Sequence, residues 1–318
     1  MAQQNKITLP WDQYTEYLNL DPVLTSLKPC SDAAGHPERD ERLFIRFHQI
    51  YEIWFAQILD ELDDLQTRLS APLIAERQME HILADIDRIN KIMTVIEEQM
   101  PILESMEAQS FVNFREYFGT ASGFQSWQFR LIETRLGLRR DERVPVFHGH
   151  FDDNLKEESR RRIKDAESIP NLFDLIDAWL SRTPFIAWGA YDFREAYRNA
   201  VLTLFQESEG KAKQKFDGEK LTTELAAIDK GRAKFEGIFD AGKHSDAQKQ
   251  GIWRLSHKAL QAALFITLYR EEPILQAPHR LLNALMDLDE TITRWRLRHA
   301  QMAQRMVGSG MGSGGSSG

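Results

Sequence analysis

The stretch "RDERLFIRFHQIYEIWFAQILDELDDLQTRL" (residues 39–69) decides the fold class of this protein. Its large apolar residues recur every three or four positions, so in a helix they lie on one broad face. They are Phe44, Phe47, Tyr51, Trp54, Phe55, Ile58, Leu59 and Leu62. A face of this width is typical of a helix packed against several neighbours. We therefore expect a long amphipathic helix within a helical bundle.

The same period continues through most of the chain. It predicts further helices over residues 76–100, 109–118, 123–137, 170–181, 188–208, 219–239, 246–270 and 279–306. No window alternates between apolar and polar residues as a half-buried strand does, so we predict no sheet. The fold class is expected to be all-α, with residues 1–318 forming one domain.

Three segments depart from this regular pattern. Residues 1–38 are rich in proline and aromatic residues and are expected to form an irregular N-terminal arm. Residues 138–169 are highly charged and are expected to lie between two packed blocks. Residues 209–249 are the most polar part of the chain and are predicted to protrude into solvent.

The composition excludes several classes of protein. Forty basic against forty-eight acidic residues give a net charge of -8, without the basic excess that nucleic-acid binding requires. The single cysteine, Cys30, excludes an intramolecular disulfide and a site with several thiolate ligands. The sequence has no long apolar run and no signal-peptide core. We expect a soluble, cytoplasmic protein without nucleic-acid or membrane partners.

Two of the nine histidines have unusual surroundings. At helical spacing, His48 and His299 are flanked by aromatic and methionine residues: Phe44, Tyr51 and Phe55 for the first, and Trp295, Met302 and Met306 for the second. Either residue alone could be a core histidine hydrogen-bonded to a carbonyl or carboxylate. Together they are also compatible with a haem pocket, which needs one imidazole on the iron and an apolar cavity. The residues alone leave both interpretations open.

Other polar motifs allow more than one interpretation. "FHGHFDD" (147–153) is interpreted as a solvated turn, since no companion metal-binding pattern exists. In "GTASG" (119–123), Ser122 is a candidate N-cap of the following helix, and Gly123 permits a close approach of the backbone. Arg115 could form a surface ion pair or bind a substrate carboxylate. The terminal "GSGMGSGGSSG" has the composition of a flexible linker.

Three blocks of the sequence resemble the tryptophan 2,3-dioxygenase family, in the family's order and spacing. They are "DERLFIRFHQIYEIWFAQILDEL", "ILESMEAQSFVNFREYFGTASGFQSWQFRLIETRLG" and "WRLRHAQMAQRMVGSGMGSGGSSG". The resemblance implies that residues 39–137 form the distal haem and substrate helices. Residues 279–318 would form the haem-ligand helix and an active-site loop, and residues 138–278 a more variable helical region. It also implies haem b as cofactor, O2 as co-substrate and a homotetramer built as a dimer of dimers.

The resemblance also implies roles around the iron and the substrate ring. His299 corresponds to the axial ligand of the haem iron, and His48 to the distal histidine that faces the indole N–H. Phe44 corresponds to an aromatic residue that packs on the substrate ring.

Further positions correspond to the residues that bind the amino-acid part of the substrate. Arg115 matches the partner of the carboxylate, and Ser122 and Gly123 match the turn that lines the distal pocket. Ser313, in the terminal Gly/Ser segment, stands where the family usually has a threonine whose hydroxyl helps to hold the ammonium and carboxylate groups. The resemblance therefore identifies this segment as an active-site loop.

The N-terminal arm carries the family's "YxxYL" pattern at Tyr14, Tyr17 and Leu18, which in the family reaches the active site of a neighbouring subunit. Phe111 departs from the family pattern, because many bacterial members have a tyrosine at this position.

The function implied is oxidation of L-tryptophan across the indole C2–C3 bond to N-formyl-L-kynurenine, a reaction of tryptophan catabolism in the kynurenine pathway. One alternative is a haem monooxygenase that acts on tryptophan or a methylated tryptophan in natural-product biosynthesis. The other is a non-catalytic helical haem-binding or scaffold protein.

Overall fold

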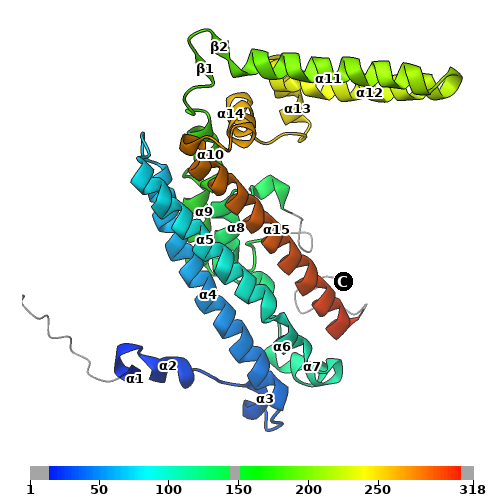
Figure 1. The fold of residues 1–318 in the computed structure, drawn as a ribbon. Helices are drawn as coiled ribbons and strands as arrows, with labels where there is room; N and C mark the ends of the chain where they lie inside the picture. The colour runs from blue at the N-terminus through cyan, green and yellow to red at the C-terminus, as the bar shows by residue number, and fades with distance from the viewer. Residues whose placement is uncertain (1–13, 144–150, 309–318) are drawn as a thin grey trace, which may run out of the picture.

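The computed structural model describes residues 14–143 and 151–308. Its framework is three long helices that lie side by side: α4 (Arg39–Leu69), α5 (Glu76–Glu98) and α15 (Pro273–Val307) (Figure 1). The last of them is far from the other two in sequence. The prediction of an all-α fold is confirmed.

The apolar face of α4 forms the centre of the core, as its spacing predicts. Ile58, Leu62 and Leu65 are fully buried there. They pack in one apolar cluster with residues of α5 and α15, among them Ile82, Ile86, Ile89, Leu281 and Leu288. Burial of apolar surface, worth about 25 cal/mol per Å², is the main force that holds such helices together.

Shorter elements surround this framework. They are α6 (Met100–Glu104), α7 (Ala108–Arg115), η1 (Glu116–Phe118), η2 (Gly123–Gln125), α8 (Trp127–Leu136), η3 (Arg140–Glu142), α9 (Glu157–Glu167), α10 (Leu172–Leu180), α13 (Ala241–Lys249) and α14 (His257–Leu268). None of the helices in the described residues is long and apolar enough to span a bilayer.

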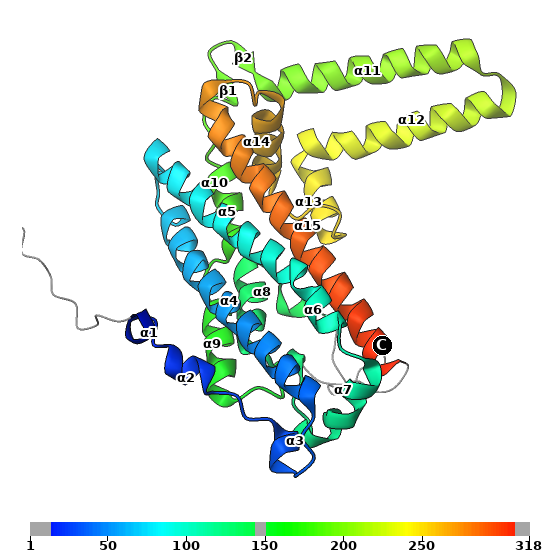
Figure 2. The ribbon, with the colours of Figure 1, turned by 60° about the horizontal axis from the view of Figure 1, so that its bottom comes forward.

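Two antiparallel helices, α11 (Phe193–Lys215) and α12 (Gly218–Phe239), project from the body as a hairpin (Figure 2). The predicted protrusion at residues 209–249 therefore exists, although it begins and ends earlier in the chain, and α13 within that range is not part of it. Phe205 and Phe235 meet between the two helices with ring centroids 5.6 Å apart.

The arm contains three short helices: α1 (Tyr14–Tyr17), α2 (Leu20–Leu24) and α3 (Cys30–Ala33). The described part of the arm is therefore more regular than the sequence suggests. Glu41 of α4 anchors its end, because its buried carboxylate accepts hydrogen bonds from the backbone N–H groups of Cys30 and Ser31 at 2.7 and 2.9 Å.

Several predicted boundaries were wrong. A two-stranded antiparallel hairpin, β1 (Ala187–Trp188) and β2 (Tyr191–Asp192), occupies the start of the helix expected at 188–208, so the prediction of no sheet was also wrong. The expected helix 246–270 is two helices, separated by a turn in which Gly251 has a φ of 70°. Gly251 adopts this left-handed conformation without the steric penalty of a side chain.

Candidate functional site

Helix α4 places Phe44 and His48 one turn apart. The Nδ1 atom of His48 lies 2.7 Å from the backbone oxygen of Phe44. A carbonyl only accepts hydrogen bonds, so Nδ1 carries the proton and Nε2 keeps a lone pair. Burial lowers the pKa of His48, partly offset by this hydrogen bond and by the charge of Glu52. The imidazole is therefore neutral at physiological pH and can accept a hydrogen bond through Nε2.

Helix α15 carries His299 near its C-terminal end. Burial, reinforced by the charge of His48, lowers the pKa of His299 to about 4. This ring is neutral as well, and an unprotonated imidazole nitrogen is what a metal ion binds. The electrostatic effect also means that the two histidines lie near one another, although they come from opposite ends of the chain.

Aromatic side chains surround His48. Phe44 lies 4.2 Å from the His48 ring, centroid to centroid, and contacts three phenylalanines of α7 and η1. These are Phe111 at 5.8 Å, Phe114 at 5.6 Å and Phe118, stacked nearly parallel at 5.7 Å. The aromatic wall next to the His48 ring, formed by Phe44, Phe111, Phe114 and Phe118, is thus suited to packing against a flat apolar ring.

A second aromatic group surrounds His299. Trp295 lies one turn before His299, with ring centroids 5.6 Å apart. Its indole also contacts Phe129 of α8 at 5.0 Å, and Tyr51 and Phe55 of α4 at 6.3 and 6.4 Å. Helices α4, α8 and α15 therefore meet beside the second histidine.

Arg115 and the turn after it lie at the end of the bundle that carries Phe44 and His48. Arg115 is partly buried and directly follows Phe114, which contacts Phe44. Ser122 caps the 3-10 turn η2, since its Oγ accepts a hydrogen bond from the Phe124 N–H at 3.3 Å. The prediction that Ser122 caps the following α-helix was wrong, because Ser126 caps α8.

Gly123 begins η2 and is exposed, and a Cβ atom at this position would meet nothing within 4 Å. The protein itself therefore does not require glycine here. The open space beside the backbone is compatible with the predicted close approach of a ligand.

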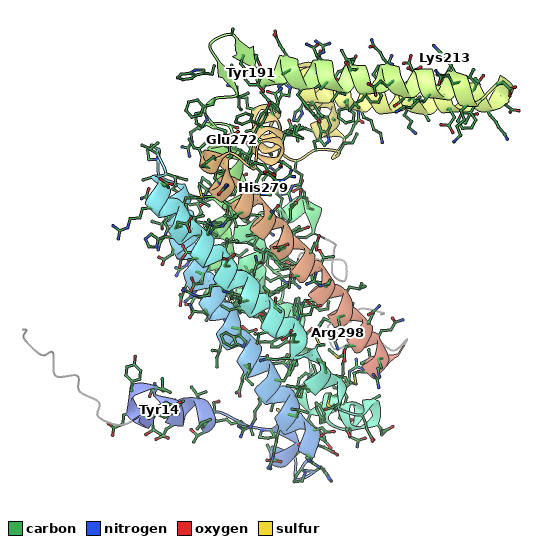
Figure 3. All side chains as sticks on the ribbon, in the orientation of Figure 1. Tyr14, Tyr191, Lys213, Glu272, His279 and Arg298 are labelled. Carbon is green, nitrogen blue, oxygen red and sulfur yellow. The ribbon has the colours of Figure 1, made fainter. Side chains whose placement is uncertain are left out.

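The arm residues lie away from the histidine pair. Tyr14 and Tyr17 are 74% and 64% exposed, and Leu18 is 41% exposed. Figure 3 shows Tyr14 on the segment that stands off the helical body. Tyr14, Tyr17 and Leu18 therefore do not line the site of their own chain. Ser313 lies outside the described residues.

The "FHGHFDD" motif is only partly within the described residues, because His148 and His150 lie outside them. Asp152 is buried, and its two oxygens accept hydrogen bonds from Arg140 at 3.0 and 2.9 Å. The prediction of a solvated turn was wrong for this residue, because the arginine compensates for the loss of water around the carboxylate.

Comparison with known proteins agrees with this geometry. The tryptophan 2,3-dioxygenase family model matches residues 2–318. The chain belongs to the tryptophan 2,3-dioxygenase family. It is 41% identical over 307 residues to tryptophan 2,3-dioxygenase of Bdellovibrio bacteriovorus, covering 96% of this chain and 86% of the relative. It is also 41% identical to the enzymes of Xenopus laevis and Anopheles gambiae, with 96% of this chain and 75% and 78% of the relatives covered.

The donor set fits the haem expected of a tryptophan 2,3-dioxygenase family member. Among residues 14–143 and 151–308, no group of three or more histidine, cysteine or acidic side chains could hold a metal ion. Haem needs only one protein ligand, because the porphyrin supplies four nitrogens. One neutral imidazole among aromatic side chains is therefore a suitable environment for it.

Two of the phenylalanines that pack around Phe44, Phe114 and Phe118, were not identified as site residues from the sequence. Phe114 and Phe118 follow Phe111 at intervals of three and four residues, so one helical face was visible in the sequence. The helix is too short for this period to stand out. Nothing in the sequence indicated that this face packs against Phe44.

Proposed function

We propose that this chain is a haem-dependent tryptophan 2,3-dioxygenase. It would insert both atoms of O2 across the indole C2–C3 bond of L-tryptophan and form N-formyl-L-kynurenine. The observation that carries the proposal is the pair of neutral, partly buried histidines, His48 and His299, among the aromatic side chains of α4, α7, α8 and α15. Family membership supports the choice of tryptophan as substrate.

The two histidines would have different roles. His299 would bind the iron, an assignment supported by the match of its motif to the family's ligand helix. Haem b would supply the iron that activates O2. His48 Nε2 would accept a hydrogen bond from the indole N–H, because the Phe44 carbonyl holds the proton on Nδ1.

The remaining site residues would orient the substrate. Phe44 would pack on the indole, supported from behind by Phe111, Phe114 and Phe118. Arg115 would pair with the carboxylate through its planar guanidinium, which favours one orientation of the amino acid. Fixing the substrate in this way lowers the entropic cost of the reaction, and the aromatic wall excludes water.

The arm supports a homotetramer in which Tyr14, Tyr17 and Leu18 contribute to a neighbouring subunit's site. Their exposure, and the position of α1 off the helical body in Figure 3, are what such an exchange requires. Light scattering of the purified protein tests the oligomeric state. A monomer would contradict this part of the proposal.

The test of the reaction is isotope labelling. The reduced, haem-loaded protein is mixed with L-tryptophan under O2 labelled in both atoms, and the product is weighed by mass spectrometry. Two labelled atoms in the product are expected. One labelled atom would establish a monooxygenase instead, and the absence of product from a haem-loaded protein would contradict the proposed activity.

A further inference from the structure

Three arginines occupy alternate positions directly before His299, in "RWRLRH" (294–299). Two of them attach α15 to one side of the bundle. Arg294 pairs with Glu97 of α5 at 3.3 Å, and Arg298 pairs with Glu104 of α6 at 2.9 Å. Figure 3 shows Arg298 near the C-terminal end of α15. Both carboxylates keep some contact with solvent, at 21% and 25% exposure.

The third arginine attaches α15 to a different element. Arg296 lies 3.4 Å from the carboxylate of Glu133 on α8. Glu133 is only 5% exposed and also pairs with Arg130 and Arg143. Because two other guanidinium groups bind this buried carboxylate, the Glu133 side chain keeps one rotamer. An exposed side chain, in contrast, changes rotamer freely.

The positions of the three arginines around the helix differ. Successive residues of an α-helix are rotated by about 100°, so Arg294 and Arg298 point within about 40° of each other. Arg296 points to nearly the opposite side of α15. His299 and Trp295 lie on the arc between them, on the face that turns toward the core. Charge pairs therefore hold the helix from both sides of the face that carries His299.

We propose that Arg296, through its ion pair with Glu133, is a positioning residue that sets the rotation of α15 and so aims the His299 imidazole. The inference rests on the proposed role of His299 as the haem ligand. Arg294 and Arg298 share one side of the helix, so each can substitute for the other. Arg296 is alone on its side, and its partner is the buried one.

This asymmetry defines the experiment. Arg296→Ala and Arg294→Ala each remove one charge from α15, and both arginines are about half exposed, at 51% and 53%. Replacement of Glu133 is avoided because it would leave Arg130 and Arg143 without their counter-charge. Two properties of each haem-loaded variant are measured: the rate of haem transfer to excess apomyoglobin, and the iron–histidine stretching frequency of the ferrous protein by resonance Raman spectroscopy.

Removal of a side chain that orients a metal ligand typically weakens metal binding about 10- to 100-fold, so Arg296→Ala is expected to accelerate haem loss by this factor. The iron–histidine frequency should shift as well, a change that a general loss of stability would not produce. The partner of Arg294, Glu97, keeps contact with solvent, and Arg298 still holds the same side of α15, so Arg294→Ala should accelerate haem loss by less than about fivefold. The double variant Arg294→Ala/Arg298→Ala should lose haem as fast as Arg296→Ala, because it removes both ion pairs on the other side of the helix. Arg296→Lys, which keeps the charge, should recover part of the haem retention.

Equal haem-loss rates and equal iron–histidine frequencies for Arg296→Ala and Arg294→Ala would overturn the inference. Thermal unfolding of each haem-free variant shows whether Arg296→Ala folds; if it does not, Arg296→Gln is compared in its place. Failure of the proposed function gives a different result. In that case the wild-type protein lacks the iron–histidine band, and His299→Ala retains haem as the wild type does.

Discussion

His299 on α15 lies close enough to His48 on α4 for a positive charge on His48 to lower the pKa of His299. Burial acts in the same direction on both residues. Burial disfavours the charged form of both imidazoles, so both are neutral at physiological pH. This is the protonation state required of a metal ligand and of a hydrogen-bond acceptor.

The stability of the haem-free protein should therefore depend on pH. Folding lowers the pKa of His299 from 6.5 to about 4. Between these values the unfolded chain binds more protons than the folded protein, so stability falls as the pH falls. His299 is expected to lower the free energy of unfolding by at most about 2 kcal/mol between about pH 7 and pH 5. This is an upper value, because the ring keeps some contact with water.

Urea unfolding of the haem-free protein at the two pH values measures this loss. The stability of His299→Leu should depend less on pH than that of the wild type. His36 is exposed, so His36→Gln should keep the pH dependence of the wild type. An unchanged dependence in His299→Leu would show that another group controls the acid sensitivity.

Replacement of Arg115 should weaken substrate binding. A charge-assisted hydrogen bond to a carboxylate contributes about 1.5–3 kcal/mol, so Arg115→Ala should raise the KM for L-tryptophan about 10- to 100-fold. The ferric haem spectrum should stay unchanged, because Arg115 is not on the ligand helix. Steady-state kinetics and absorption spectra check both points. Arg42→Ala, at an exposed ion pair of α4, serves as the control, and an unaltered KM in Arg115→Ala would exclude the assigned role.

The fold could be predicted largely from the sequence where a broad apolar face repeats over many turns. Helix α4 begins and ends where the pattern of residues 39–69 does. Helix α9 was missed because only Ile163 is buried in it, so charged residues hide its period. The strands β1 and β2 contain two residues each, too few for any alternation to be visible.

The candidate site was predictable to the extent that its residues share a helix. The spacing of Phe44 and His48 places them one turn apart in any helix. Their relation to Phe118 and Phe129 depends on how α7 and α8 pack, which no local pattern specifies. The burial of Glu133 was also invisible, because Arg130 and Glu133 stand three residues apart, and opposite charges at this spacing are typical of an exposed helix face.

Removal of the Tyr51 hydroxyl should destabilise the protein. This buried hydroxyl donates a 2.5 Å hydrogen bond to the backbone oxygen of Ile96 and so joins α4 to the end of α5. Tyr51→Phe leaves that carbonyl without this donor in an apolar environment, at an expected cost of about 1–2 kcal/mol. Urea unfolding measures the loss. Tyr191→Phe removes a hydroxyl whose hydrogen bond to Tyr269 is exposed to solvent, so it should change stability by less than about 0.5 kcal/mol, and equal values for both variants would contradict the prediction.

Two glycines of the projecting hairpin should respond in opposite ways to replacement by alanine. Gly237 lies at the base of the hairpin, where an added Cβ atom would approach the Trp253 ring to 2.7 Å. The ring must move, so Gly237→Ala is expected to cost about 1–3 kcal/mol despite its better helix propensity. Gly210 of α11 has open space at the same position. Gly210→Ala should stabilise the protein by about 0.4–1 kcal/mol, because it restricts only the unfolded chain.

Urea unfolding followed by tryptophan fluorescence compares the two variants, and limited proteolysis reports on the hairpin itself. Gly237→Ala should be cleaved faster within α11 and α12 than the wild type, and Gly210→Ala more slowly. If both variants gained stability, helix propensity alone would control this region. The contact between Gly237 and Trp253 would then not be what attaches the base of the hairpin to the body.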